Sequence, residues 1–440
     1  MEATSVVLIR NARLLDPAGG VDGQRDLLVV AGKVARIAPR IPSSEARSAT
    51  GPEEPCLTID AEGLWLLPGL VDIHVHFREP GFTRKETLAT GGRAAAAGGY
   101  TTVVCEPNTE PPVCTADQVR VLAEKARREA PVHVYFKAAM SRDRAGLEPN
   151  DVAELAKQER VVALSDDGDP VVDPALMEEV CRRAAAADIP LTPHCEDSPR
   201  ALEMIRDGRH PGFEPEEPYT NEPRYVHRDL EIAARCGCRV HFSHVSTGQS
   251  VRRIEEYRSR ARVSYELTPH HLLLSIDDHG GGEVPQVNPP IRSAADREAL
   301  QRALLSGSAD VIASDHAPHT AADKASGASG LIGLETTLGL MLTHFVAEEK
   351  LPPAALVRLM SLSPARLLGL PAGTLQPGRR ADMTLVDPCR EWTVDPDSFR
   401  SLSRNTPFAG RSLRGKAVAT WVEGKEVFAE SCLEDRRARA

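Results

Sequence analysis

The chain has 440 residues, of which 41% are hydrophobic and 26% charged, so it can bury a sizeable core and is not intrinsically disordered. Its 53 Lys and Arg against 63 Asp and Glu give a formal charge of −10, which argues against a nucleic-acid binder with a basic face. No apolar run or N-terminal segment is typical of a membrane span or signal peptide. Nine scattered cysteines without a CxxC pair indicate reduced thiols, so we expect a cytoplasmic protein that does not bind membranes.

Both ends of the chain are rich in short β segments. The N-terminal part contains three of them, separated by turn-rich stretches, at 6–15, 26–37 and 56–67. The C-terminal part has the same character at 381–387, 416–422 and 424–428. We therefore expect 1–66 and 370–430 to meet as one small β-sandwich domain, followed by a solvated tail over 431–440.

Between these ends, β-branched runs alternate with segments of helical character rich in Ala, Arg and Glu. Eight strand candidates can be identified, at 70–76, 101–107, 132–140, 160–167, 189–197, 239–246, 263–271 and 310–318. Their nearly continuous apolar character is typical of strands buried on both faces of a parallel sheet. The pattern predicts a (β/α)8 barrel, an α/β fold, over 67–369. An open doubly wound sheet is the alternative, but no GxGxxG follows an early strand.

Polar residues recur where the barrel strands end. His74 and His76 are two apart, so both point to the same face at the end of the first strand, where barrel active sites lie. Four later strands also end in His or Asp, at Asp166 and Asp167, His194, His244 and Asp315. Their convergence at one mouth would be costly unless they bind metal. Four His and two carboxylates are six ligands, which is more than one tetrahedral zinc needs. We therefore favour two ions that share a bridging carboxylate and a hydroxide over six independent structural residues.

These motifs resemble the dihydroorotase family, and more narrowly the longer bacterial type (type I) within the amidohydrolase superfamily. The similarity extends from Val6 to Phe428 and rests on HVHFREPG, CEPNT, SDDG, HCED, HVST, VNPP and ASDHAPH. It implies a centre of two Zn²⁺ ions held by His74, His76, Asp167, His194, His244 and Asp315. Many relatives bridge the metals with a carbamylated lysine on strand four. VVALSDDG has none, so the resemblance assigns the bridge to Asp167, and we interpret Lys137 as an ordinary strand-end lysine.

The resemblance also implies an activity, the reversible cyclisation of N-carbamoyl-L-aspartate to L-dihydroorotate and water in pyrimidine biosynthesis. A metal-bound hydroxide would open the ring amide, and Asp315 would carry the proton to the leaving nitrogen. The family positions for the substrate carboxylate match Arg78, Asn108 and His319. Those that contact the ring match Asn288 and the backbone of Gly330.

Other conspicuous histidines are expected to be structural. We expect packing roles for His270 and His271, and His241 is opposite in phase to His244 and should face outward. The stretch 315–330 is a few residues shorter than is usual in the family and rich in Ala, Gly and Ser. It is therefore expected to form a mobile lid.

Several alternatives remain open. A hydantoinase, dihydropyrimidinase or allantoinase would keep the same site but act on another ring, and an inactive barrel could serve as the structural partner of aspartate transcarbamoylase. An active subunit that needs this transcarbamoylase for full activity is a mixed case. Cobalt or manganese would suit the ligands as well as zinc. A homodimer is the default expectation for oligomeric state.

Overall fold

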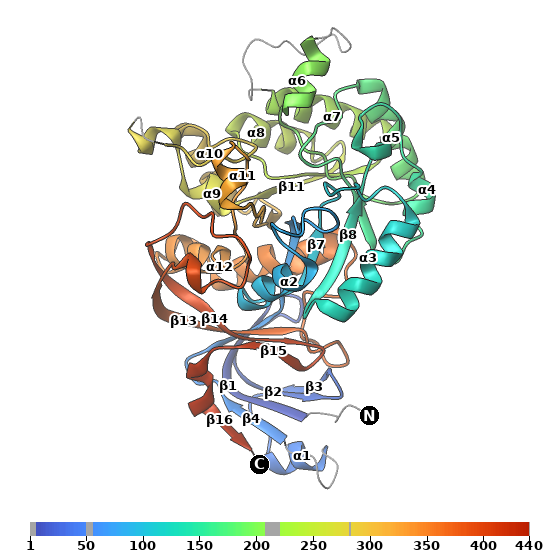
Figure 1. Cartoon of the computed structure of the whole chain (residues 1–440). Coiled ribbons are helices and arrows are strands. Elements are labelled where there is room, and N and C mark those ends of the chain that lie inside the picture. Colours follow the sequence, from blue (N-terminus) through green and yellow to red (C-terminus); the bar gives the residue numbers. More distant parts are fainter. Residues whose placement is uncertain (1–5, 50–55, 207–220, 281–282, 440) are drawn as a thin grey trace.

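The computed structural model describes residues 6–49, 56–206, 221–280 and 283–439. Figure 1 shows a barrel surrounded by helices, with a layer of strands from both ends of the chain packed against one end of it. The predicted fold class, a (β/α)8 barrel with a β-sandwich built from the N- and C-terminal segments, is confirmed. In the described residues, no helix is both long and apolar enough to cross a membrane.

Within the described part of the barrel, seven regular strands pair in parallel in two groups. The first group is β6 (Leu70–Val75), β7 (Tyr100–Cys105), β8 (His133–Ala138) and β9 (Val161–Leu164). The second is β10 (Arg239–Phe242), β11 (Arg262–Leu267) and β12 (Val311–Ile312). Both groups follow the order of the chain, as expected for βα repeats.

Single bridges close the barrel. Leu191 pairs in parallel with Leu164 on one side and with Val240 on the other, and it takes the place of the fifth strand. Pro190 and Pro193 flank this position, and the missing N–H groups of proline shorten the ladder there. Val75 then pairs with His316, and the N–H of His76 donates to the His316 carbonyl at 2.8 Å, which joins the first strand to the eighth.

Helices cover the outside of the barrel or stand in its loops. They are α2 (Leu88–Ala97), α3 (Ala116–Glu129), α4 (Val152–Leu155), α5 (Pro174–Ala186), α6 (Pro199–Arg206), α7 (Glu222–Cys236), α8 (Gly248–Tyr257), α9 (Pro269–Leu273), α10 (Ala294–Ser306), α11 (Ala321–Ala325), α12 (Thr337–Met341), α13 (Pro353–Val357) and α14 (Ser363–Leu367). The helix α3 shows why such segments form. Thr115 and Gln118 make a reciprocal capping box, and Val119, Leu122 and Ala126 face the core at helical spacing.

The two ends of the chain form one sheet beside the barrel. Its strands are β1 (Val6–Asp16), β2 (Val21–Val30), β3 (Lys33–Ala38), β4 (Cys56–Asp60), β5 (Trp65–Pro68), β13 (Met383–Thr393), β14 (Ser412–Val422), β15 (Lys425–Ala429) and β16 (Arg437–Arg439), and α1 (Ser43–Ser48) lies between β3 and β4. The antiparallel pairing of β5 with β13 joins the two ends, with Leu66 opposite Leu385. These leucines are fully buried in one cluster with Trp421.

The C-terminal residues differ from the expected solvated tail. Within the described part of 431–440, β16 pairs antiparallel with β4, so that Arg437 stands opposite Ile59. Leu433 is 1% exposed and packs into the core of the sandwich. A free edge on β4 and one apolar side chain therefore hold a segment whose charged composition alone predicts solvent exposure.

Candidate metal centre

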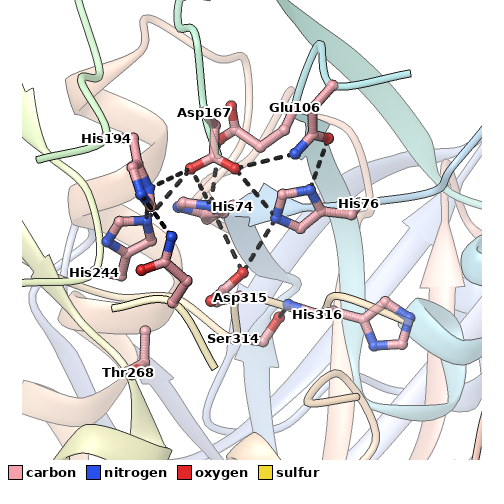
Figure 2. Close-up of polar contacts among 12 residues, drawn as sticks. His74, His76, Glu106, Asp167, His194, His244, Thr268, Ser314, Asp315 and His316 are labelled. Atoms are coloured by element: carbon pink, nitrogen blue, oxygen red, sulfur yellow. Dashed lines mark hydrogen bonds and ion pairs between the residues drawn. The ribbon is translucent and has the colours of Figure 1, made fainter. Parts of the chain in front are cut away.

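The six predicted metal ligands meet at the carboxyl ends of the barrel strands, and all are buried (Figure 2). His74 lies on β6 and His76 directly after it, Asp167 follows β9, and Asp315 follows β12. The remaining two, His194 and His244, follow Leu191 and β10. Parallel strands with a shared direction bring these distant segments to one face of the barrel.

Two histidines and two aspartates form one side of the centre. His74 Nε2 lies 3.3 Å from Asp167 Oδ1 and 3.7 Å from Asp315 Oδ1. His76 Nε2 lies 3.1 Å from Asp315 Oδ1 and 3.6 Å from Asp167 Oδ2. Ligand atoms that share one tetrahedral zinc, each about 2.1 Å from it, are roughly 3.4 Å apart. The distances of 3.1–3.7 Å between these ring nitrogens and carboxylate oxygens are therefore those of side chains that could share an ion.

The other side of the centre adds two imidazoles to Asp167. Its Oδ1 lies 3.3 Å from His244 Nε2 and 3.5 Å from His194 Nδ1. Among the residues that the structure describes, two sets of three side chains are compact enough to hold an ion, His74 with Asp167 and His244, and His74 with His76 and Asp315. Asp167 therefore lies between the four histidines, as a bridging carboxylate would.

The chemistry of the donor set fits a cation. In the described part of the chain, Nε2 of His74, which faces Asp167 and Asp315, is buried without a hydrogen-bond partner. Burial alone would lower the pKa of His74, but the carboxylates of Glu106, Glu266 and Asp167 raise it well above its ordinary value. A site that favours a charged imidazole in this way would stabilise a divalent ion. The buried histidines and aspartates are thus consistent with metal binding.

Glu266, a carboxylate that the sequence analysis did not identify, contacts a histidine of the centre. Glu266 Oε1 lies 2.6 Å from His74 Nδ1, and Oε2 lies 3.1 Å from His241 Nε2. His241 is consequently 1% exposed and does not face outward as expected. The expectation was wrong because the buried carboxylate of Glu266 on the neighbouring strand forms a hydrogen bond with the ring of His241. Glu266 is the second-last residue of β11, so a search for polar residues near the ends of the strands could have found it.

Lys137 is not an ordinary strand-end lysine. Its side chain is fully buried on β8 and forms an ion pair with Glu106, a second residue that the sequence analysis missed. Glu106 Oε1 lies 3.7 Å from His74 Nε2, so the pair stands next to the centre. Burial would lower the pKa of Lys137, but Glu106 and Glu266 raise it. The correction follows from a partner on the adjacent strand, which no local pattern indicates.

Two of the predicted substrate residues stand at the mouth of the barrel. Arg78 donates from Nε to the Pro318 carbonyl at 3.2 Å, and its Nη2 lies 3.2 Å from Nε2 of His319. The backbone of Arg78 is left-handed, with φ at 58°, as is that of two of the predicted ligands, with φ at 33° for His244 and 46° for Asp315. Such strained backbone is concentrated at functional sites in proteins.

The two predicted amide contacts lie deeper, against the histidines. Asn108 Oδ1 lies 2.9 Å from His76 Nδ1, and its Nδ2 donates to Asp167 Oδ2 at 3.2 Å. Asn288 Nδ2 lies 3.2 Å from His194 Nε2. The structure therefore brings both amides to the centre, where they orient its side chains.

Gly330 is held in a narrow place beside the mouth. Its N–H donates to the Gln286 carbonyl at 2.9 Å, and its own carbonyl accepts from Lys324 Nζ at 3.0 Å and Asn405 Nδ2 at 2.9 Å. With φ at 136°, a Cβ here would lie 2.6 Å from the Ala317 carbonyl oxygen. Only glycine fits this backbone without displacing the loop.

Three further residues take supporting roles. Asp166 accepts from the backbone N–H groups of Met140 and Ser141 at 2.8 and 3.2 Å, and burial raises its pKa to about 6. His270 and His271 are buried and bond Thr268 Oγ1 at 3.1 and 2.8 Å. Both histidines are packed as expected for structural residues.

Comparisons with known proteins agree with this arrangement. A model of the amidohydrolase family matches residues 65–427. The chain is 41% identical to a dihydroorotase from Anaeromyxobacter dehalogenans, over 97% of this chain and 99% of that protein. It is 39% identical to one from Syntrophus aciditrophicus, over 96% and 99%. Among solved structures, an L-hydantoinase (dihydropyrimidinase) from Arthrobacter aurescens has a TM-score of 0.82 and 29% identity, covering 97% of this chain and 96% of its own.

Proposed function

The chain belongs to the amidohydrolase family, and from this membership we propose that it is a dihydroorotase that interconverts N-carbamoyl-L-aspartate and L-dihydroorotate. The chain matches relatives named dihydroorotase over nearly their whole length, which supports this activity. One feature of the site favours a ring that carries a carboxylate. The guanidinium of Arg78 stands at the mouth beside the buried histidines and aspartates. A ring that bears a carboxylate pairs with such a cation, whereas neutral hydantoin has no carboxylate.

We propose that two Zn²⁺ ions occupy the centre. His74, His76 and Asp315 would hold one side, His194 and His244 the other, and Asp167 would bridge them. Divalent zinc lowers the pKa of bound water and polarises a carbonyl oxygen, which is the chemistry needed to open a cyclic amide. The unpartnered buried Nε2 of His74, which faces Asp167 and Asp315, supports the assignment.

Proton transfer is assigned to Asp315. Its Oδ1 lies 3.1 Å from His76 Nε2, and a carboxylate at this position can exchange a proton with an attacking water and with the ring nitrogen. In ring opening, the carboxylate takes a proton from the attacking water and gives it to the ring nitrogen as the C–N bond breaks. Cyclisation runs through the same steps in reverse, with loss of water.

The remaining contacts orient the substrate. Arg78, Asn108 and His319 are proposed for the substrate carboxylate, and Asn288 with the Gly330 backbone for the ring. Since Asn108 bonds His76 and Asp167, it would act at the border between the metal centre and the carboxylate. The hydrogen bonds of Gly330 to Gln286, Lys324 and Asn405 hold its peptide group beside the mouth.

Domain organisation and assembly complete the proposal. The pairing of β5 with β13 supports one sandwich domain from 1–66 and 370–430, beside a barrel over 67–369. We place the enzyme in the cytoplasm as a homodimer, and we propose aspartate transcarbamoylase as a partner that completes its activity. Gel filtration with and without that transcarbamoylase tests the assembly.

The decisive experiment is ring opening of L-dihydroorotate by the zinc-loaded protein, followed by loss of its absorbance. Asp315→Ala, checked for folding by circular dichroism, is the control, and hydantoin and dihydrouracil are tested in parallel. Turnover of dihydroorotate that disappears in the variant supports the proposal. Turnover of a neutral ring alone would show a hydantoinase. An inactive protein with two metals would be retested with the transcarbamoylase, and one that binds no metal would overturn catalysis in favour of a scaffold.

A further inference from the structure

His319 lies between two cationic side chains at the mouth of the barrel. Lys85 Nζ is 3.2 Å from its Nδ1, and Arg78 Nη2 is 3.2 Å from its Nε2. The carbonyl oxygen of Ser329 lies 2.8 Å from Nε2 as well. The imidazole is 8% exposed, so these three groups set its protonation and orientation. No motif in the sequence marks Lys85 for this place.

The hydrogen-bond chemistry of these neighbours selects one form of the ring. An ammonium group has only donors, so Nδ1 must accept from Lys85 with its lone pair. The single proton of the neutral ring is then on Nε2, where the Ser329 carbonyl accepts it at 2.8 Å, so Arg78 Nη2 at 3.2 Å cannot donate to this nitrogen at the same time. Burial, followed by the charges of Arg78 and Lys85, lowers the pKa of His319 to about 3, which agrees with a neutral ring.

Lys85 is itself held firmly in this position. Its backbone N–H donates to the Phe82 carbonyl at 2.8 Å, and its ammonium lies 5.1 Å from the centre of the Phe82 ring. Asp323 Oδ2 lies 3.7 Å from the ammonium and provides a counter-charge from α11. Asp323 is in turn fixed by Thr320, whose hydroxyl donates to it at 2.7 Å.

We propose that Lys85 is a positioning residue that fixes His319 as a neutral imidazole donating from Nε2. The carboxylate of the substrate would take the place of the Ser329 carbonyl and receive this proton. Arg78 and Lys85 would then be the two positive charges around the anion, which selects cyclic amides that carry a carboxylate over neutral ones. The choice of substrate class rests on the proposed function, whereas the tautomer of His319 does not.

A purely structural role for Lys85, tying its loop to Asp323, is the competing explanation. The chain offers a matched control for it. Arg84 is the adjacent residue, carries the same charge and donates to Asp323 Oδ1 at 3.1 Å, but its side chain is 63% exposed and bonds only Asp323 among the described residues. Arg84→Met therefore removes a charge and a loop contact while leaving His319 untouched.

The first test measures the tautomer by ¹⁵N NMR of histidine-labelled protein, with the His319 signal assigned by His319→Gln. In the wild type and in Arg84→Met, we expect the Nε2–H form. In Lys85→Met, Nδ1 loses its donor and the signal should shift towards a mixture of the two tautomers. A charged ring or an Nδ1–H form in the wild type would overturn the proposal, as would an unchanged signal in Lys85→Met.

The second test separates KM from kcat. Lys85→Met should raise KM for L-dihydroorotate about 10- to 100-fold, which is the loss expected for a charge-assisted hydrogen bond, with little change in kcat. Lys85→Arg should recover part of the loss. An equal rise in Arg84→Met, or a fall in kcat alone, would contradict the positioning role.

The two tests distinguish failure of the inference from failure of the proposed function. If the wild type does not open dihydroorotate, the proposed function fails, but the NMR comparison still decides whether Lys85 sets the tautomer. If dihydroorotate is opened and Lys85→Met leaves both the tautomer and KM unchanged, only the inference fails.

Discussion

The carboxylate of Glu266 links two predicted ligands of the metal centre, His74 and His244. Its Oε1 lies 2.6 Å from Nδ1 of His74 and accepts from the backbone N–H of His244 at 3.1 Å. A proton on Nδ1 of His74 is thereby directed to Glu266, and the lone pair of Nε2 points to the aspartates. Partners of this kind orient metal-binding imidazoles and raise their basicity.

Replacing this carboxylate should weaken metal binding without changing a ligand. For Glu266→Gln we expect a loss of about 10- to 100-fold in zinc affinity, because the amide is a weaker acceptor for His74. Competition with a chromophoric chelator measures the affinity. Glu298→Gln, on the exposed face of α10, serves as the control. Equal affinities in the two variants would show that Glu266 has no such role.

The buried pair of Glu106 and Lys137 should be strongly coupled in stability. Lys137→Met leaves a carboxylate buried without its partner, and we expect the free energy of unfolding to fall by about 3–5 kcal/mol. The double variant Glu106→Met with Lys137→Met removes both charges and should recover much of that loss. Urea unfolding in the presence of a chelator measures all three proteins. A double variant that is no more stable than Lys137→Met would mean that the two side chains do not interact energetically.

Metal removal should lower thermal stability as well as abolish activity. A ligand that binds only the folded state adds about 4 kcal/mol when its concentration is a thousand times Kd. Calorimetry of the zinc-loaded and chelator-treated protein should therefore show a large difference in Tm. In His194→Ala, which lacks a ring next to Asp167, the difference should be smaller. The same difference in both proteins would place the zinc elsewhere.

Gly330→Ala tests the loop beside the mouth. The added methyl group would meet the Ala317 carbonyl, and the left-handed backbone adds strain, so we expect a loss of about 1–3 kcal/mol in stability and a higher KM. Gly327→Ala is the matched control, because its φ is also positive, at 86°, but nothing lies within 4 Å of its Cβ position. Similar effects in both would indicate strain alone, without a role for the close approach.

Much of the centre follows from local rules. His74 and His76 share a face because side chains alternate along a strand, and Asp167, His194, His244 and Asp315 meet them because the ends of parallel strands lie together. The β-rich ends of the chain likewise predicted the sandwich. These features depend on periodicity and chain order, which a single sequence contains.

Contacts across strands were decided only by the tertiary structure. Glu266 forms a hydrogen bond with His74, 192 positions away in the chain, and Lys137 on β8 forms an ion pair with Glu106 at the end of the neighbouring strand. His241 turned out to be buried, and Lys85 was found beside His319, for the same reason. Which side chains meet depends on strand register and on loop paths between distant segments. A one-dimensional pattern shows where polar residues stand, whereas their partners are set by how the closed barrel aligns them.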